Sequence, residues 1–175
     1  MKKLATLFAT AILLTTLSTF GQSAFKTHKI GHVFSITLPD YMSRTVGLNS
    51  AANFQYKSEV KDVYGFVIAD DKEELKLAEL NFASVTEFNE DFMKSFLTNA
   101  EKKSIGTPVV KKIGETSFLE CDVTYFDKDA GGEIYYLVGI VETKSAFYKI
   151  LSWSLAENKD KFKADFQKIL YSFKN

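Results

Sequence analysis

The sequence predicts an α+β fold, an α/β/α sandwich in which helices flank a central antiparallel sheet. Three observations lead to this prediction. The second half of the chain holds four apolar strand-like segments that are separated by short turns. Two of these segments are apolar on both faces, so water must be excluded from both sides of the sheet. Two amphipathic helical segments are available to cover those faces.

The N-terminus has the pattern of a secretory signal peptide. Met1-Lys2-Lys3 precedes an apolar run from Leu4 to Leu17, and small residues follow. The run is shorter than the ~20 residues that a membrane-spanning helix needs. We expect cleavage after Gly21, with Ala24 as the second choice, which leaves residues 22–175 as one domain. No cysteine lies directly after the run, where a lipid anchor would need one, so we expect a periplasmic or secreted protein without a lipid anchor.

The composition narrows the classes of function. Basic and acidic residues are balanced at 22 each, so nothing favours nucleic acid or an anionic membrane as the partner. Two histidines and one cysteine offer few zinc ligands and no internal disulfide. Stability must therefore come from packing, which 16 phenylalanines, 8 tyrosines and one tryptophan can supply.

The first half of the mature chain predicts short strands followed by a helix. Its segments are a strand over 26–38, a loop over 41–50, strands over 53–59 and 63–69, and either a helix over 71–80 or a strand over 77–83. In the first strand, alternate residues from Ile30 to Leu38 share one face, which is apolar apart from His32, and Pro39 ends the strand. Ser84 and Glu87 form a capping-box pattern. After it, apolar residues spaced by four predict a helix that ends near Lys102-Lys103.

The second half predicts a strand meander and a closing helix. The segments are strands over 109–113, 117–126, 133–143 and 146–155, a tight turn over 127–132, and a helix over 157–173. In the strand over 133–143, Tyr136 and Val138 lie on one face, and Tyr135 and Leu137 lie on the other. Turns of hairpin length make these strands antiparallel.

Two segments and this order of elements resemble the PsbP-like superfamily. The segments are Phe34 to Tyr41 (FSITLPDY) and Ile169 to Phe173 (ILYSF), with a mid-chain helix and a strand meander between them. That superfamily includes extrinsic subunits of the photosynthetic oxygen-evolving complex, Ran-binding Mog proteins and bacterial secreted proteins. The resemblance implies an antiparallel sheet between helices and a binding or accessory role. It carries no metal-binding or partner-binding residue onto this chain.

The candidate reactive residues each have a structural interpretation that we prefer. His32 lies on the apolar face of the first expected strand, which favours a structural histidine, and His28 lies near the new N-terminus, where chains are often loose. Cys121 is interpreted as a buried small hydrophobe rather than a reactive thiol. Residues 127–138 begin like a calcium loop, but the later ligand positions do not match, which favours a hairpin. Residues 70–74 are acidic, which favours a helix start over a cation site.

Aromatic residues gather on the last two expected strands: Tyr135, Tyr136, Phe147, Tyr148 and Trp153. The preferred interpretation is the core of a sheet that is covered on both sides. The alternative is a small-molecule groove or an exposed recognition patch.

The leading hypothesis is an exported, non-catalytic binding or accessory module whose partner is a protein or a small ligand outside the cytoplasm. One alternative is a secreted hydrolase or other enzyme that uses His32 and carboxylates, and this requires a polar cleft beside His32. A second alternative is a carrier of a small apolar ligand, which requires a closed cavity of ~300 Å³ or more. No residue is assigned a catalytic, cofactor-binding or metal-binding role.

Overall fold

The computed structural model describes residues 24–175, so the expected signal peptide over 1–21 lies outside the described residues. The strands are β1 (Phe25–Ile30), β2 (Phe34–Pro39), β3 (Ser43–Arg44), β4 (Phe54–Ser58), β5 (Val63–Asp71), β6 (Glu101–Ile105), β7 (Val109–Ile113), β8 (Thr116–Asp127), β9 (Gly132–Glu142) and β10 (Ala146–Leu155). The helices are α1 (Lys72–Leu77), α2 (Val85–Ser95), the short 3-10 helix η1 (Ala156–Asn158) and α3 (Lys159–Tyr171). Within residues 24–175, no helix has the length and apolar character to cross a membrane.

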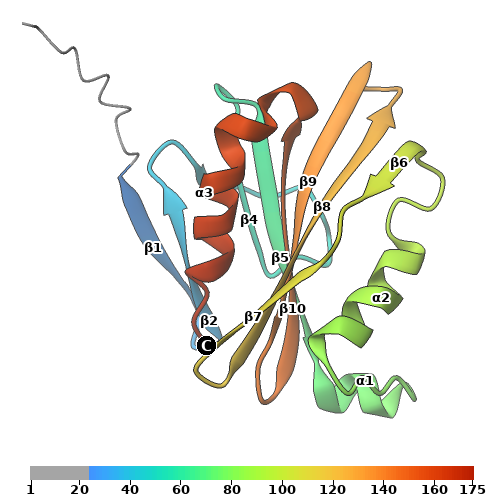
Figure 1. Cartoon of the computed structure of the whole chain (residues 1–175). Coiled ribbons are helices and arrows are strands. Elements are labelled where there is room, and N and C mark those ends of the chain that lie inside the picture. Colours follow the sequence, from blue (N-terminus) through green and yellow to red (C-terminus); the bar gives the residue numbers. More distant parts are fainter. Residues whose placement is uncertain (1–23) are drawn as a thin grey trace, which may run out of the picture.

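The centre of the fold is an eight-stranded antiparallel sheet (Figure 1). Its strands follow the order β3-β4-β5-β10-β9-β8-β6, and β7 pairs with β8 beyond the end of β6. The long strands β8, β9 and β10 follow one another through hairpins, as the sequence predicts. The mixed α+β class and the central antiparallel sheet are therefore confirmed.

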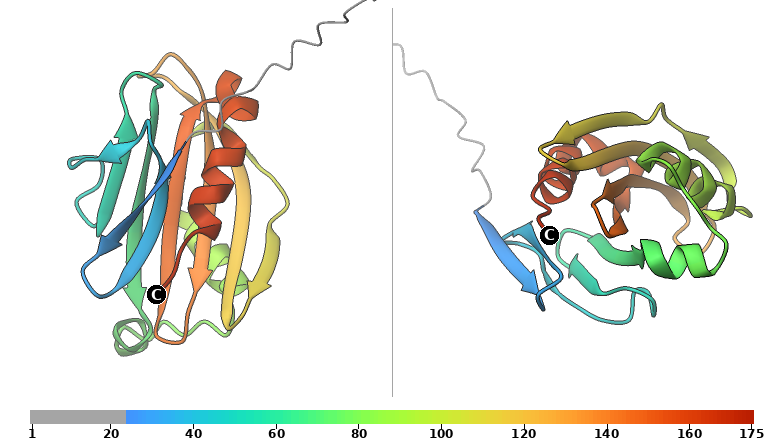
Figure 2. Two further views of the ribbon diagram at one scale, coloured as in Figure 1. Left: turned by 90° about the vertical axis from the view of Figure 1, so that its left-hand side faces the viewer. Right: turned by 90° about the horizontal axis from the view of Figure 1, so that it is seen from below.

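One face of the sheet packs against α3 and against the β1–β2 hairpin, which lie side by side in Figure 2. Alternate residues of β9 and β10 point to this side, including Tyr135, Leu137 and Tyr148. The apolar side of α3 supplies Phe162 and Phe166, both fully buried. The described core on this side is filled by large side chains, which does not favour the carrier hypothesis.

The other face packs against α2. The opposite set of β9 residues, Val138 and Ile140, joins Leu119 of β8 and Phe147 of β10 under the helix. Phe88 of α2 stacks on Phe147 with ring centroids 4.4 Å apart. The two clusters confirm that the apolar character of both faces of β9 reflects packing on both sides of the sheet.

The expected single strand over 26–38 is wrong, because the segment folds as the β1–β2 hairpin. Gly31 has a φ of +55° and lets the chain reverse in the middle of the alternating pattern. The hairpin forms a separate two-stranded sheet. Its strand β2 also pairs with the chain end, where the Ser35 N–H donates to the Lys174 carbonyl at 2.7 Å.

Two further differences concern the helices. Residues 72–77 form a helix, so the strand expected as an alternative over 77–83 is wrong. The second helix starts where expected, with the Ser84 hydroxyl accepting the Glu87 N–H, but it ends at Ser95 instead of near Lys103. Phe96 has an extended backbone, and residues 101–105 form β6 because the edge of β8 offers backbone hydrogen bonds there.

Candidate functional site

The shortened α2 leaves part of its sheet face uncovered, near the β8–β9 hairpin at the end of the sheet opposite α1 (Figure 1). Three aromatic residues meet there at one level across three strands. Trp153 of β10 pairs in register with Tyr64 of β5 on one side and with Tyr136 of β9 on the other. Their side chains share one face of the sheet, and all three are partly exposed.

The rings form a continuous stack. The Trp153 ring lies 5.6 Å from Tyr64 and 5.2 Å from Tyr136, with interplanar angles of 23° and 26°. Tyr125 of β8 extends the row, 6.1 Å from Tyr136. Phe96, at the C-terminal end of α2, meets Tyr136 edge to face, and both residues pack against the core under the helix. Neighbouring rings therefore cover much of both faces of the indole.

Two carboxylates border the stack and hold its outer tyrosines. The Tyr64 hydroxyl donates to Asp62 at 2.7 Å, and the Tyr125 hydroxyl donates to Asp127 at 2.8 Å. The hydrogen bond to Asp62 is the main cause that raises the pKa of Tyr64. Burial and then Asp127 raise the pKa of Tyr125 to about 12. Both phenols are therefore neutral donors at physiological pH.

Asp127 also organises the hairpin turn. Its Oδ1 accepts the N–H groups of Asp129 and Ala130 at 2.9 and 3.0 Å. The Ala130 N–H and then the Tyr125 hydroxyl lower the pKa of Asp127, so this carboxylate is ionised throughout the neutral range. The residues after Gly132 continue directly into β9, so the tight-hairpin interpretation of residues 127–138 is confirmed.

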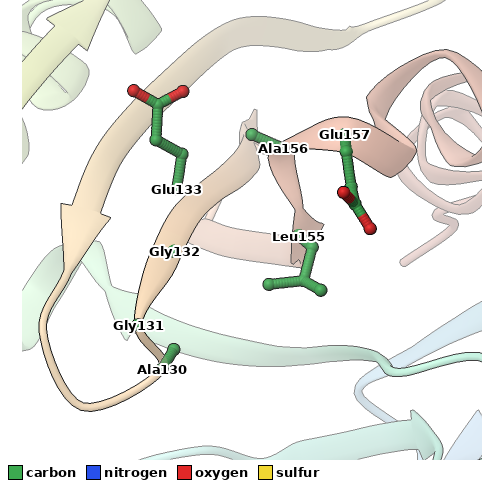
Figure 3. Close-up of a pocket in the computed structure, with 7 residues that line it drawn as sticks. All are labelled: Ala130, Gly131, Gly132, Glu133, Leu155, Ala156 and Glu157. Carbon is green, nitrogen blue, oxygen red and sulfur yellow. The ribbon is translucent and has the colours of Figure 1, made fainter.

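These residues line a groove of about 350 Å³, within the range of small-ligand sites. Its floor is the aromatic stack, and its edges include Asp62, Asp127 and Ile134. A second, more open depression of about 570 Å³ adjoins it and shares Ala130 and Leu155 with it. Figure 3 shows the Gly131–Gly132 turn on one side of this depression and residues 155–157 on the other.

The aromatic residues singled out from the sequence divide between core and groove. Tyr135, Phe147 and Tyr148 are almost completely buried, as the core interpretation predicts. Tyr136 and Trp153 line the groove, as the alternative predicts. Tyr64 and Tyr125 are not among the residues singled out from the sequence, although alternation along the expected strands places each of them on a defined face. Cross-strand register, which brings them together, cannot be read from either segment alone.

The histidines do not form a catalytic arrangement. His32 lies exposed in the turn between β1 and β2, so its expected place on an apolar strand face is wrong. The shallow depression beside it is lined by two lysines, Lys29 and Lys174, and by no aspartate or glutamate. His28 lies in β1, paired with Ile36, rather than in a loose terminus. Burial and then Lys26 lower the pKa of His28. The hydrolase hypothesis gains no support from this geometry.

The other single residues have structural surroundings. Cys121 is buried and its thiol contacts the Gly106 carbonyl at 3.2 Å. Burial and then Asp122 raise the pKa of this thiol, as expected for an unreactive cysteine. Asp71 caps α1 by accepting the N–H groups of Glu73 and Glu74, so the helix-start interpretation of residues 70–74 is confirmed. Among residues 24–175, no three potential ligand side chains gather as a metal ion requires.

One ionic cluster on the opposite face fixes α3 to the sheet. Asp122 of β8 accepts Lys163 at 2.6 Å, Lys159 at 2.9 Å and the Tyr135 hydroxyl at 2.8 Å. Burial alone would raise the pKa of Asp122, but these three hydrogen bonds outweigh burial and lower the pKa. The carboxylate is satisfied by its own chain, so this cluster is structural.

Known proteins match this chain in structure but not in sequence. No family model matches the sequence, and no curated protein sequence matches it. The structure is similar to cyanobacterial PsbP from Synechocystis, with a TM-score of 0.65 at 12% identity over 92% of this chain and 98% of that one. It is also similar to LpqN of Mycobacterium tuberculosis, a protein involved in cell envelope biogenesis, with a TM-score of 0.58 at 10% identity over 85% and 90% of the two chains. A protein of unknown function from Pseudomonas aeruginosa matches with a TM-score of 0.50 at 7% identity over 82% and 92%.

Proposed function

With the PsbP-like fold confirmed, we propose that this chain is an exported, non-catalytic binding module and that the aromatic groove is its recognition site. The observation that carries the proposal is the partly exposed stack of Tyr64, Trp153 and Tyr136 beyond the end of α2. An aromatic patch of this kind, rimmed by polar groups, is a common mark of a binding surface.

The stack lies at the edge of the core under α2. Tyr136 packs against the apolar cluster under α2, whereas Tyr64 and Trp153 belong to neither of the two clusters of the sheet. Tyrosine and tryptophan combine an apolar body with a polar tip, which makes them the residue types most suited to a surface that alternates between water and a partner. The groove therefore leaves apolar ring surface in contact with water, which a sheet end with only a structural role would not need.

The chemistry of the groove favours binding over catalysis. Its two carboxylates accept hydrogen bonds from tyrosine hydroxyls, and the lowered pKa of Asp127 makes this group a poor general acid. The residues that line the groove include no histidine and no cysteine. A module that holds a partner without transforming it agrees with this set of side chains.

Two observations support a role outside the cytoplasm. The first is the signal-peptide pattern of residues 1–21. The second is the similarity in fold to LpqN, which is involved in cell envelope biogenesis, and to cyanobacterial PsbP. On this proposal the mature domain over 22–175 works as an accessory subunit or receptor in the envelope or the medium.

The test compares two variants of the full chain, expressed in a Gram-negative host with its own N-terminus and a C-terminal tag. Trp153→Leu removes the centre of the groove, and Val110→Ser changes an exposed residue on β7 as a matched control. After cross-linking and purification from the extracytoplasmic fraction, we expect a ligand or partner that the wild type and the control retain and the groove variant loses. Retention by all three proteins, or a full-length chain that stays in the cytoplasm, would contradict the proposal.

A further inference from the structure

We infer that the groove recognises a basic peptide segment of a partner protein, with lysine or arginine side chains lying along the aromatic stack. This inference rests on the proposed binding role and adds the chemistry of the partner. It starts from the charges around the groove and the adjoining depression. Four carboxylate residues line the two hollows, namely Asp62, Asp127, Glu133 and Glu157, and no lysine or arginine lines either of them.

This local excess of acid contrasts with the chain as a whole, in which acidic and basic residues are equal in number. Within residues 24–175, none of the four carboxylates forms a salt bridge with a lysine or arginine. Lys61 and Lys128 directly adjoin Asp62 and Asp127 in the chain, but the Lys61 ammonium lies over the Tyr41 ring and Lys128 is paired with Glu101. The negative potential of the groove is therefore not neutralised by the protein itself, and it favours a cationic occupant.

The arrangement of the rings favours lysine and arginine side chains over a small quaternary ammonium ion. A small quaternary ammonium ion binds best against open ring faces. Here Tyr64 and Tyr136 cover much of both faces of Trp153, so the groove presents ring edges and hydroxyls rather than an aromatic cage. The long aliphatic stems of lysine and arginine can cover such an apolar surface while their charged ends reach the bordering carboxylates.

The shape of the site also favours an extended occupant. The groove and the adjoining depression share Ala130 and Leu155, so one continuous surface carries all four carboxylates. Asp62 and Asp127 stand beside the stack, whereas Glu133 and Glu157 line the neighbouring hollow. A peptide with basic residues at intervals can contact both parts at once, which a single small amine cannot.

The test uses fluorescein-labelled pentapeptides with blocked ends and residues 22–175 in low-salt buffer. The probes are alternating Lys-Gly-Lys-Gly-Lys, its serine analogue and its glutamate analogue, and spermidine serves as a competing small polyamine. Anisotropy reports binding, and the emission of Trp153, the only tryptophan in the chain, reports contact with the groove. We expect the lysine peptide to bind, to shift the Trp153 emission and to lose affinity as salt rises.

Two matched double variants test whether the carboxylates beside the stack contact the peptide. In Asp62→Asn/Asp127→Asn, one oxygen remains at each position, for the Tyr64 hydroxyl and for the turn N–H groups, and the new amide nitrogen at 127 can donate to the Tyr125 hydroxyl oxygen. Asparagine also suits the positive φ of 51° at position 62. Since each partly exposed ion pair contributes little, we expect the two substitutions together to lower the affinity for the lysine peptide by about three- to ten-fold. Glu90→Gln/Glu115→Gln removes the same amount of charge from exposed positions that line neither hollow, and we expect affinity to change less than about two-fold.

The remaining outcomes separate this inference from the proposed function. If the serine or glutamate peptide binds the groove as tightly as the lysine peptide, recognition of a basic segment is wrong while the binding role stands. If spermidine matches the lysine peptide in affinity, the occupant is a small amine and the peptide inference is wrong. If no probe changes the Trp153 emission, the inference fails, and the pull-down with Trp153→Leu decides the proposed function independently.

Discussion

Gly65 on β5 lies opposite Tyr56 of β4, and an alanine at this position would collide with the tyrosine ring. An ideal Cβ at Gly65 lies 2.5 Å from the Tyr56 hydroxyl oxygen and closer still to two ring carbons. Tyr56 is fully buried, and its hydroxyl shares a 2.7 Å hydrogen bond with the Ser152 hydroxyl. The ring has no free space to enter, so we predict that Gly65→Ala destabilises the protein.

The expected cost has three parts. Forcing an extra methyl group into a packed core costs about 1–3 kcal/mol. Displacing the ring breaks the buried hydrogen bond, which adds about 1–3 kcal/mol. The better strand propensity of alanine returns about 0.5–1 kcal/mol. The net change in the free energy of unfolding is therefore about 1–5 kcal/mol, centred on about 3 kcal/mol, and this central value lowers the urea midpoint by about 1–2 M.

Urea unfolding followed by circular dichroism measures this change, and two variants make the result specific. Gly132→Ala is the control, because its new Cβ would meet only a Leu155 methyl group at 3.8 Å, and we expect a change within ~0.5 kcal/mol. Adding Tyr56→Leu to Gly65→Ala removes the clash, so the double variant should lose at least ~1 kcal/mol less than the sum of the singles. An unchanged midpoint in Gly65→Ala, or strict additivity in the double variant, would refute the reasoning.

Three other predictions concern the anchoring of α3, the contrast between core and groove, and the thiol. Asp122→Asn should destabilise the protein by about 1–3 kcal/mol at pH 7, a value limited by the partial exposure of the cluster. Because the folded-state pKa of Asp122 is lowered, its stabilisation is present above about pH 4 and is lost as pH falls through the lowered pKa, so urea midpoints of the two proteins should converge near pH 2. Phe166→Ala should cost about 3–5 kcal/mol in the same assay, whereas Trp153→Leu at the open groove should cost less than ~2 kcal/mol, and equal costs would show that Trp153 is core. Cys121 should react with a chromogenic disulfide reagent only on the timescale of unfolding, and rapid reaction in native buffer would contradict its burial.

The strand meander and the closing helix could be predicted from the sequence because local signals agree there. The Asp127 turn separates two long alternating segments, and α3 carries phenylalanines at helical spacing. The β1–β2 hairpin could not be predicted, because Ile30 and Phe34 on the two sides of the Gly31 turn fit a single continued alternation. A single glycine in such a pattern is equally compatible with a strand.

The groove was only half predictable for a different reason. Alternation in β9 and β10 correctly places Tyr136 and Trp153 on the face that α2 covers. How far along that face the helix extends depends on where the helix ends. The lysines at 102 and 103 suggest an end that is later than the observed one, because the contact of Phe96 with Tyr136 is not visible in the sequence. Tyr136 and Trp153 therefore belong to the groove because α2 does not extend over them, and not because they lie on a different face of the sheet.

The pairing of Ser35 with Lys174 limits when the β1–β2 hairpin can dock onto the rest of the fold. Two backbone hydrogen bonds, of 2.7 and 3.0 Å, join Ser35 of β2 to Lys174, which follows α3. The β1–β2 hairpin can dock fully only after α3 and Lys174 have been synthesised, since both are its neighbours in the fold. During synthesis the hairpin therefore stays undocked until α3 has left the ribosome, although its two strands can pair earlier.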